Sequence, residues 1–427
     1  MTRYLPSPPL GTATLLRTAL LCAGLSTGTF AGATVDLALR LETSLSSNSN
    51  LFRVAEPGTA TVPVPTDVVS ARAHRHLMAF AAGLPLDSDD TRLVLTTQLG
   101  WDRYNGNNVI NNQSKEVTAR LPWRFGKLVE GEWVRGHTTQ PYALDQDYQR
   151  LDLVTRDWHG MVLTLKPTPW LSFPVQLVRQ TLRHQDQPAH GSLDENRTRT
   201  SVAARYLSPT GSSLQLGSAR TQATFPRREA LPELANRAQF TDQDTFVDMT
   251  WNYSPLTQLS WRWTNRQRHY AAAPELNSHM ALSRLNLSHA PSPLSRVDLQ
   301  WWQQPTETDN PALLYGAVQG FGVSVNWFAS PLTTLTLQWQ QETQDDKPSA
   351  PVNAFAQENP RTRRLAARLQ HNIVRGVNAY VDVARETRTR ERQGRSTQNV
   401  VRVGLDYTYD NIPGAPARTR AAAAPEF

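Results

Sequence analysis

Cysteine is nearly absent from this sequence, and its scarcity limits the chemistry of the chain. Among 427 residues there is one cysteine, Cys22, and it lies inside an apolar N-terminal stretch. If that stretch is removed, the remaining chain has no thiol, so we expect neither a disulfide nor a thiolate metal site. Leu21, directly before the cysteine, is not small, which disfavours a lipoprotein signal.

Long hydrophobic runs are also lacking, and the mean hydropathy is −0.48. This excludes a polytopic helical membrane protein. The only continuous apolar stretch follows Arg3 and Arg17, contains "TALLCAGL" and ends at the small residues "AGA" of positions 31–33. This order is typical of a secretory signal peptide, so we expect residues 1–33 to be removed before Thr34.

Recognisable catalytic patterns are absent too. The sequence has no Walker-type glycine loop, no GxGxxG after a strand, no HExxH and no GxSxG elbow. Two aspartate pairs supply too few oxygen ligands for a calcium site: Asp145 with Asp147, and Asp242 with Asp244. The sequence therefore predicts no enzymatic activity, no cofactor and no metal site. An enzymatic alternative would use His269, His279 and Asp309, which are scattered polar residues without a shared motif.

Strong net charge is not present either. The formal net charge is +7 and becomes +5 without Arg3 and Arg17. A modestly basic chain is compatible with an anionic ligand or an anionic lipid surface, but it has no nucleic-acid footprint.

What the sequence does have is alternation of apolar and polar residues with period 2. In "NVVRVGLDYTYDN", Val401, Val403 and Leu405 alternate with Arg402 and Asp406. The same pattern recurs in "VDLALRLE", "RLVLTTQLGW", "EVTARLPWRF", "LSWRWTNRQR", "FGVSVNW", "LTLQWQQE" and "VNAYVDVA". Strands with one apolar and one polar face have this pattern, although soluble sandwiches share it.

The connections between these segments alternate in length. Short turns such as "SPTGSS", "SPLT" and "APSPLS" follow some segments. Longer polar stretches at 44–72, 105–114, 183–197 and 343–360 follow the others. Transmembrane β-barrels show this asymmetry, with short periplasmic turns and long external loops. The first long loop contains "NSNLF" and could fold over or into a pore; its composition does not decide.

Aromatic residues cluster beside the short turns and at the last strand: Phe125, Trp170, Tyr206, Tyr253, Trp327, Tyr407 and Tyr409. Such a belt marks one membrane interface. We therefore predict an all-β fold, a transmembrane antiparallel β-barrel over residues 34–410 in the bacterial outer membrane, with about 18 strands (16–18). Residues 411–427 are expected to form a disordered tail. Either Tyr409 or Phe427 would serve as the assembly signal.

Strand parity predicts which side chains face the lumen. The inward candidates for contact with a solute are Arg120, Arg124, Arg262, Arg266, Arg284, Arg296, Arg364, Arg368, Arg402, Trp302 and Tyr380. The inward carboxylates are Asp248, Asp298, Asp382 and Asp406. These charges could neutralise one another across neighbouring strands. Alternatively, arginines could bind carboxylates of an acidic polysaccharide while the two aromatic rings stack on its sugars.

Several segments resemble the EpsL-like outer-membrane proteins that accompany exopolysaccharide synthesis and protein-sorting loci. They are "NSNLFR", "LPWRFGKLVEGEW", "ARYLSPTGSSLQL", "FTDQDTFVDMTWNYSPLTQLSWRW" and "FGVSVNWFASPLTTLTLQWQQE". The resemblance extends over nearly the whole chain after residue 33 as strand-and-turn texture, and the tail departs from it. It implies a passive conduit that secretes an exopolysaccharide, together with a possible periplasmic export partner. The alternatives are a general or anion-preferring porin for small-solute uptake, or a structural barrel of a secretion complex.

Overall fold

The computed structural model describes residues 36–63, 67–86, 91–142, 144, 148–308, 310, 312–349 and 357–410. The expected signal peptide and the expected tail lie outside these residues, as do Asp145, Asp147 and Asp309. Within the described part, no helix is long and apolar enough to cross a membrane.

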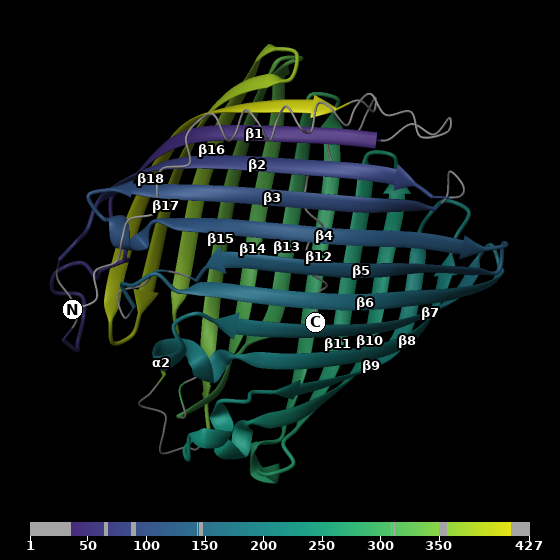
Figure 1. The fold of residues 1–427 in the computed structure, drawn as a ribbon, viewed down its shortest axis with the longest axis horizontal. Helices are drawn as coiled ribbons and strands as arrows, with labels where there is room; N and C mark the ends of the chain where they lie inside the picture. Colours follow the sequence, from purple (N-terminus) through teal and green to yellow (C-terminus); the bar gives the residue numbers. More distant parts are fainter. Residues whose placement is uncertain are drawn as a thin grey trace.

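The segments with alternating apolar and polar side chains form strands of a single antiparallel sheet in the described residues (Figure 1). Its eighteen strands are β1 (Asp36–Asn48), β2 (Ala71–Pro85), β3 (Arg92–Asn105), β4 (Asn112–Phe125), β5 (Val129–Pro141), β6 (Leu153–Thr168), β7 (Leu171–His184), β8 (Glu195–Leu207), β9 (Ser213–Thr224), β10 (Gln239–Ser254), β11 (Thr257–His269), β12 (Ser278–Ser292), β13 (Ser295–Thr306), β14 (Leu313–Ser330), β15 (Thr333–Pro348), β16 (Arg361–Val374), β17 (Val377–Arg390) and β18 (Gly394–Asp410). The predicted fold class and strand number are confirmed.

The sheet closes on itself. Each strand pairs with its neighbour in sequence, and β1 also pairs with β18, with Leu41 opposite Tyr407. Closure satisfies the backbone N–H and C=O groups of every strand and removes the sheet edges, which a lipid environment requires. A barrel of this size has room for a lumen that side chains do not fill.

The two ends of the barrel differ. Short turns and the first residue of β1 lie at one end. The other end has most of the longer connections, together with the three-residue turn from β17 to β18. It also has the short helices α2 (Gln187–His190), η2 (Asn108–Ile110), η3 (Gly191–Leu193), η4 (Arg228–Ala230), η5 (Ala235–Arg237) and η6 (Pro274–Leu276) (Figure 1). In outer-membrane barrels the short turns are periplasmic, so the helices and long connections form the external mouth.

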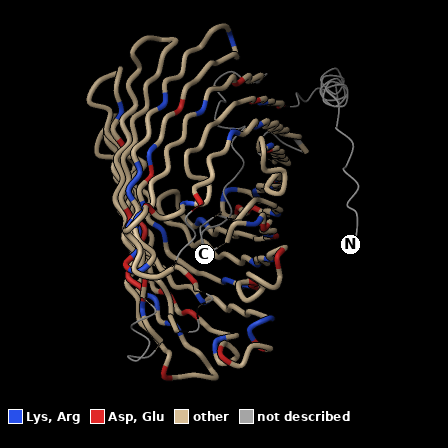
Figure 2. The backbone as a smooth tube through the Cα atoms, turned by 90° about the vertical axis from the view of Figure 1, so that its left-hand side faces the viewer, with Lys and Arg blue, Asp and Glu red and all other residues tan. Residues whose placement is uncertain are grey.

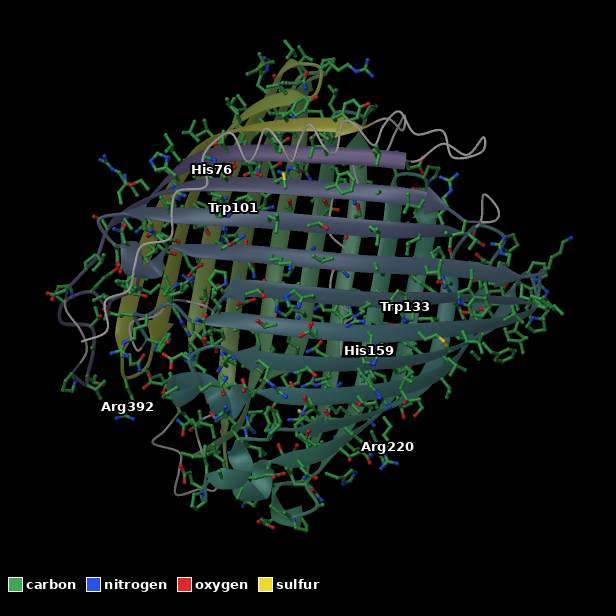
Figure 3. All side chains as sticks on the ribbon, viewed as in Figure 1. His76, Trp101, Trp133, His159, Arg220 and Arg392 are labelled. Atoms are coloured by element: carbon green, nitrogen blue, oxygen red, sulfur yellow. The ribbon has the colours of Figure 1, made fainter. Side chains whose placement is uncertain are left out.

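The outer face is apolar over the middle of the strands. Leu45, Leu369 and Val403 expose 56%, 50% and 52% of their surface. His76 and its register partner Trp101 lie on the front strands with Trp133 (Figure 3). The predicted aromatic belt is confirmed as an exposed set at the short-turn end, since each of its residues is at least 38% exposed. Exposed apolar side chains on a closed barrel fit a lipid environment.

The polar connections are shorter than the sequence pattern predicts, because the strands continue into them. Thus β1 continues to Asn48, β7 to His184 and β15 to Pro348. Beyond the bilayer both faces of a strand are wet, so the ladder hydrogen bonds persist while the apolar alternation that identifies a strand disappears. The expected loop boundaries were therefore wrong, and the barrel wall extends into the segments that were predicted to be long connections.

Candidate functional site in the lumen

The predicted charged residues lie on the inner face of the barrel. Arg402 stands between Val401 and Val403, which are 46% and 52% exposed on the outside, and Arg368 precedes the exposed Leu369. Residues of both charge signs recur along the wall (Figure 2). Placing these charges on the lipid side would be costly, so alternation directs them toward water.

One group of predicted arginines lines a cavity of about 360 Å³ on the wall formed by β15 to β18. Arg364, Arg368 and Arg402 lie there with Arg53 from the first long connection, and the carboxylates in the lining are Asp382 and Glu386. We call Arg364, Arg368, Arg402 and Asp382 the loose cluster. Four guanidinium groups face two carboxylates, so the lining has an excess of positive charge.

Pairing within the loose cluster is weak. Arg368 Nε lies 3.6 Å from Asp382 Oδ1, and neither atom has a hydrogen-bond partner. Among the described residues, no ion pair joins Arg364 or Arg402 to a carboxylate. The side chains of Arg368 and Asp382 are 36% and 25% exposed. Guanidinium groups in this state keep N–H donors for a ligand that carries a carboxylate or phosphate.

A second group of arginines is held tightly by aspartates on β10. Arg266 donates to Asp244 from Nε at 2.8 Å and from Nη2 at 2.9 Å, and Arg199 donates to the same carboxylate at 3.0 Å. Arg268 donates twice to Asp242, at 2.8 and 3.0 Å. We call these five residues the tight cluster. Their side chains are at most 7% exposed. With Glu307, which lies 2.8 Å from Arg268, three carboxylates balance the three guanidinium charges within the wall.

The predicted Arg262 and Arg284 adjoin the tight cluster. Together with Arg266 they line a cavity of about 310 Å³. Arg262 Nε lies 3.5 Å from Asp248 Oδ1, and Arg284 Nη2 donates to Gln304 at 3.4 Å. Both arginines thus contact polar groups on neighbouring strands of this wall.

Three predicted arginines belong to neither cluster and form separate pairs. Arg120 lies 3.6 Å from Glu132, Arg124 lies 3.8 Å from Glu130, and Arg296 lies 3.0 Å from Asp298. All three side chains are at least 42% exposed. The structure does not bring them together with the other arginines.

Trp302 and Tyr380 face inward, but their rings lie against the wall. Trp302 is 8% exposed and Tyr380 is 2% exposed. A Cβ atom on Gly320 would lie 2.0 Å from the Trp302 ring, and one on Gly404 would lie 2.5 Å from Tyr380, so the glycines make room for the rings. The guanidinium of Arg368 covers Tyr380 at 4.1 Å. The expectation that these rings stack on sugars was wrong, because the neighbouring strands occupy their faces.

The first long connection enters the mouth. Asn50 closes a tight turn, since its side chain accepts from the Val54 N–H at 2.9 Å and donates to the Val54 carbonyl at 2.9 Å. Leu51 and Phe52 pack beneath this turn in a buried apolar cluster. Arg53, which follows in the segment "NSNLFR", lines the cavity of the loose cluster, so this segment folds into the mouth.

Arg53 joins two separate parts of the mouth. Its Nε donates to Glu386 on β17 at 2.9 Å, and its Nη1 donates to the carbonyl of Leu144, in the connection between β5 and β6, at 2.8 Å. Five strands lie between β17 and β5 in the sheet order. Arg53 thus places a positive charge across part of the opening and narrows the path above the loose cluster.

Charged residues also organise the opposite side of the mouth. Arg268 donates to Glu307 at 2.8 Å. Burial acts to raise the pKa of Glu307, but attraction to Arg268 and then Arg197 outweighs it and holds that pKa below its ordinary value. Arg228 lies over the Phe225 ring at 3.7 Å, and burial lowers the pKa of its guanidinium. These groups hold the connections in place beside the lumen.

Sequence reasoning missed one cluster at the mouth, formed by Asp152, His184 and His190. No short motif marks it, because 32 residues separate the aspartate from His184. Among the described residues, no convergent catalytic arrangement supports the enzymatic alternative. His269 is the last residue of β11, and His279 is the second residue of β12.

A closed barrel with an apolar outside, an aromatic belt and a charged lumen defines an outer-membrane β-barrel of channel-forming size. No family model and no curated protein matches the chain. Similar solved structures include Pseudomonas aeruginosa OccK1 (OpdK), with a TM-score of 0.48, 10% identity, and coverage of 88% of this chain and 98% of that chain. Acinetobacter baumannii OccAB3 has a TM-score of 0.49 at 9% identity, covering 88% and 99%. P. aeruginosa OccK2 (OpdF) in complex with glucuronate has a TM-score of 0.49 at 9% identity, covering 88% and 98%.

Proposed function

We propose that the protein is a passive outer-membrane channel for small solutes that carry a carboxylate or another anionic group. The observation that carries this proposal is the loose cluster. Its cavity is lined by four arginines and two carboxylates, and Arg364 and Arg402 form no ion pair with a described carboxylate. A solute carboxylate can therefore accept hydrogen bonds there without displacing a strong internal partner.

The tight cluster supports the proposal by contrast. Arg199, Arg266 and Arg268 meet their aspartates at 2.8–3.0 Å in a buried setting. A solute would have to break these contacts to bind. The selectivity of the channel therefore rests on the wall from β15 to β18 and on Arg53 above it.

The mouth favours small solutes over a polymer. Arg53 bridges two separate parts of the opening, and Leu51 and Phe52 anchor its loop in an apolar cluster. A polysaccharide threading through the barrel would have to displace this anchored loop. Export of an exopolysaccharide, which the EpsL-like resemblance implies, is accordingly the second reading, and it requires a periplasmic partner that opens the loop. A structural barrel is the third.

The experiment is a measurement of ion selectivity with purified protein in planar bilayers under a KCl gradient. We expect steady conductance and a reversal potential on the anion-selective side. The double variant Arg364→Gln/Arg402→Gln should move the reversal potential toward that of an unselective pore, because it removes two unpaired positive charges from the lumen.

Arg220→Gln is the control for a charge outside the lumen, since this exposed arginine shares the outer face of β9 with Leu214 and Leu216 (Figure 3). It should leave the reversal potential unchanged. A wild-type barrel that never conducts would contradict the porin reading. The export reading would then predict that a deletion strain loses surface polysaccharide and accumulates it in the periplasm, whereas a structural barrel would leave the polymer outside the periplasm.

A further inference from the structure

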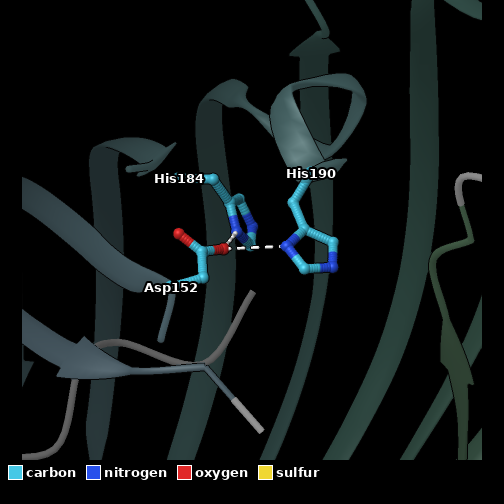
Figure 4. Close-up of side chains that lie close together, drawn as sticks. All are labelled: Asp152, His184 and His190. Atoms are coloured by element: carbon cyan, nitrogen blue, oxygen red, sulfur yellow. Dashed lines mark hydrogen bonds and ion pairs between the residues drawn. The ribbon is translucent and has the colours of Figure 1, made fainter. Parts of the chain in front are cut away.

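A buried cluster of one carboxylate and two imidazoles lies at the external mouth, apart from the lumen arginines. Asp152 directly precedes β6, His184 ends β7, and His190 ends the short helix α2. The three side chains point toward one another from the end of β7 and from two different connections (Figure 4). Their ligand atoms all lie within 4.8 Å of one another.

The geometry converges on a single oxygen. Asp152 Oδ2 lies 2.7 Å from His184 Nδ1 and 2.9 Å from His190 Nδ1 (Figure 4). The other oxygen, Oδ1, accepts the Asp186 backbone N–H at 2.9 Å. The carboxylate is thus oriented by a backbone contact that leaves Oδ2 directed at both rings. Outer contacts of this kind fix the orientation of metal ligands in known sites.

The cluster is shielded from water. The side chains of Asp152, His184 and His190 are 0%, 2% and 12% exposed. Burial acts to raise the pKa of Asp152, but the hydrogen bonds from the Asp186 N–H and from His184 and His190 outweigh it and hold that pKa below its usual value. Asp152 Oδ2 thus lies within hydrogen-bond distance of both rings in a buried setting. His190 is the partly exposed member through which an ion can reach the site.

We propose that Asp152, His184 and His190 bind a divalent transition-metal ion, with Zn²⁺ as the best match, through Oδ2 and the two Nδ1 atoms. Two neutral imidazoles and one carboxylate form a ligand set that zinc uses, and a fourth position remains for water. This site is distinct from the proposed path of anionic solutes, and it stands whether or not that function holds.

The two distances from the carboxylate oxygen to the imidazole nitrogens suit this assignment with small adjustments. Zn²⁺ binds nitrogen and oxygen at about 2.0–2.2 Å, so the ligand atoms of a tetrahedral site lie roughly 3.3 Å apart. The two oxygen–nitrogen distances of 2.7 and 2.9 Å need to open by a few tenths of an ångström. Each ring needs to move its proton from Nδ1 to Nε2, which frees a lone pair for the metal without net loss of a proton.

Neighbouring rings hold His190 in position. Its ring centroid lies 4.8 Å from Tyr142 and 4.4 Å from Tyr148. Tyr148 in turn donates a hydrogen bond from its hydroxyl to Asp186. A bound ion would join the connection before β6 to the connection after β7, and so fasten two neighbouring parts of the mouth.

The barrel also contains a natural comparison. His137 Nδ1 lies 2.8 Å from Asp157 Oδ1, which is nearly the same distance as in the proposed site. This pair has a single histidine, and its side chains are 37% and 60% exposed. It offers two ligands rather than three and should not retain a metal.

The test is equilibrium dialysis of the untagged, detergent-purified barrel against Zn²⁺ alone, followed by elemental analysis. We expect about one Zn²⁺ per chain. His190→Gln and Asp152→Asn should each weaken binding at least about tenfold, because loss of a ligand costs no less than loss of an outer contact. His137→Gln is the matched control and should bind like the wild type.

A second readout separates ligation from misfolding. The heat-dependent shift in electrophoretic mobility reports whether each variant remains a closed barrel. Co²⁺ in place of Zn²⁺ should give visible absorption bands that His190→Gln abolishes and His137→Gln leaves in place. Undiminished binding in folded His190→Gln, or equal loss in His137→Gln, would overturn the proposal, as would an absence of stoichiometric Zn²⁺ in the folded wild type.

Discussion

The two arginine clusters of the lumen wall use the same side chain in opposite ways. In the tight cluster, Arg266 and Arg199 share Asp244 at 2.8–3.0 Å, and all three side chains are nearly inaccessible. In the loose cluster, Arg368 lies 3.6 Å from Asp382 without a hydrogen bond, and Arg402 has no ion-pair partner among the described residues.

The difference teaches that an inward-facing arginine is not by itself a solute contact. A buried guanidinium between carboxylates is part of the wall, because its donors are used and its charge is compensated. An arginine with spare donors in a wet cavity remains available to an anion. Strand parity predicts that both kinds of arginine face inward, and only their contacts with carboxylates distinguish one kind from the other.

Asp244→Asn should produce the largest effect. It removes the negative charge that compensates Arg199 and Arg266, and both guanidinium groups stay buried. We expect a loss of about 3–5 kcal/mol in the free energy of unfolding. Urea titration of the barrel in lipid vesicles measures this loss. An effect as small as that of an exposed substitution would show that the tight cluster is not structural.

Substitution of one arginine in each cluster sharpens the comparison between them. Arg402→Gln should reduce anion selectivity and leave stability nearly unchanged, since no strong pair is lost. Arg266→Gln should do the reverse, because it leaves Asp244 with Arg199 as its one close guanidinium partner. Reversal potentials and urea titrations of both variants test this crossover. Equal selectivity shifts in the two variants would remove the distinction between the clusters.

Arg53→Ala addresses the access to the loose cluster. Loss of the contacts to Glu386 and to the Leu144 carbonyl should free the loop across the mouth and raise single-channel conductance. Arg53→Lys is the control, because it keeps the positive charge but not the simultaneous contacts with Glu386 and the Leu144 carbonyl. Its selectivity should match that of the wild type while its conductance also rises. Unchanged conductance in both variants would place the constriction elsewhere.

Asp382→Asn should have the smallest effect on stability, below about 1 kcal/mol, since the pair with Arg368 is long and partly exposed. It should nevertheless increase anion selectivity, because it removes one of the two carboxylates that line the cavity. A stability loss comparable to that of Asp244→Asn would mean that the loose cluster is held as firmly as the tight one.

Much of the fold could be predicted from the sequence. Period-2 alternation, as at Val401, Val403 and Leu405, identifies strands and the faces they present, because side chains reverse direction at every residue. The alternation of short and long connections predicted the orientation of the barrel in the membrane. The aromatic residues beside the short turns then predicted a belt at that end. These signals are local, so a single sequence contains them.

The rest depends on register between distant segments. Arg199 and Asp244 meet although 45 residues separate them, and nothing near either residue indicates the pair. The glycines that receive the rings of Trp302 and Tyr380 lie on neighbouring strands, so the burial of those rings was not foreseeable. Asp152 joins His184 and His190 for the same reason, through strand pairing that brings two connections together.

The pairing of β1 with β18 has a consequence for how the molecule is made. Leu41 and Tyr407 are opposite each other, yet nearly the whole chain lies between them, and Arg40 binds Asp406 across the same seam. Contacts of such long range form late, because the entropy of closing the intervening loop must be overcome first. Until β18 arrives, the growing sheet keeps two unpaired edges that are prone to join other chains. The seam is therefore where assembly is completed, and a defect there exposes the nascent protein to aggregation before it reaches a bilayer.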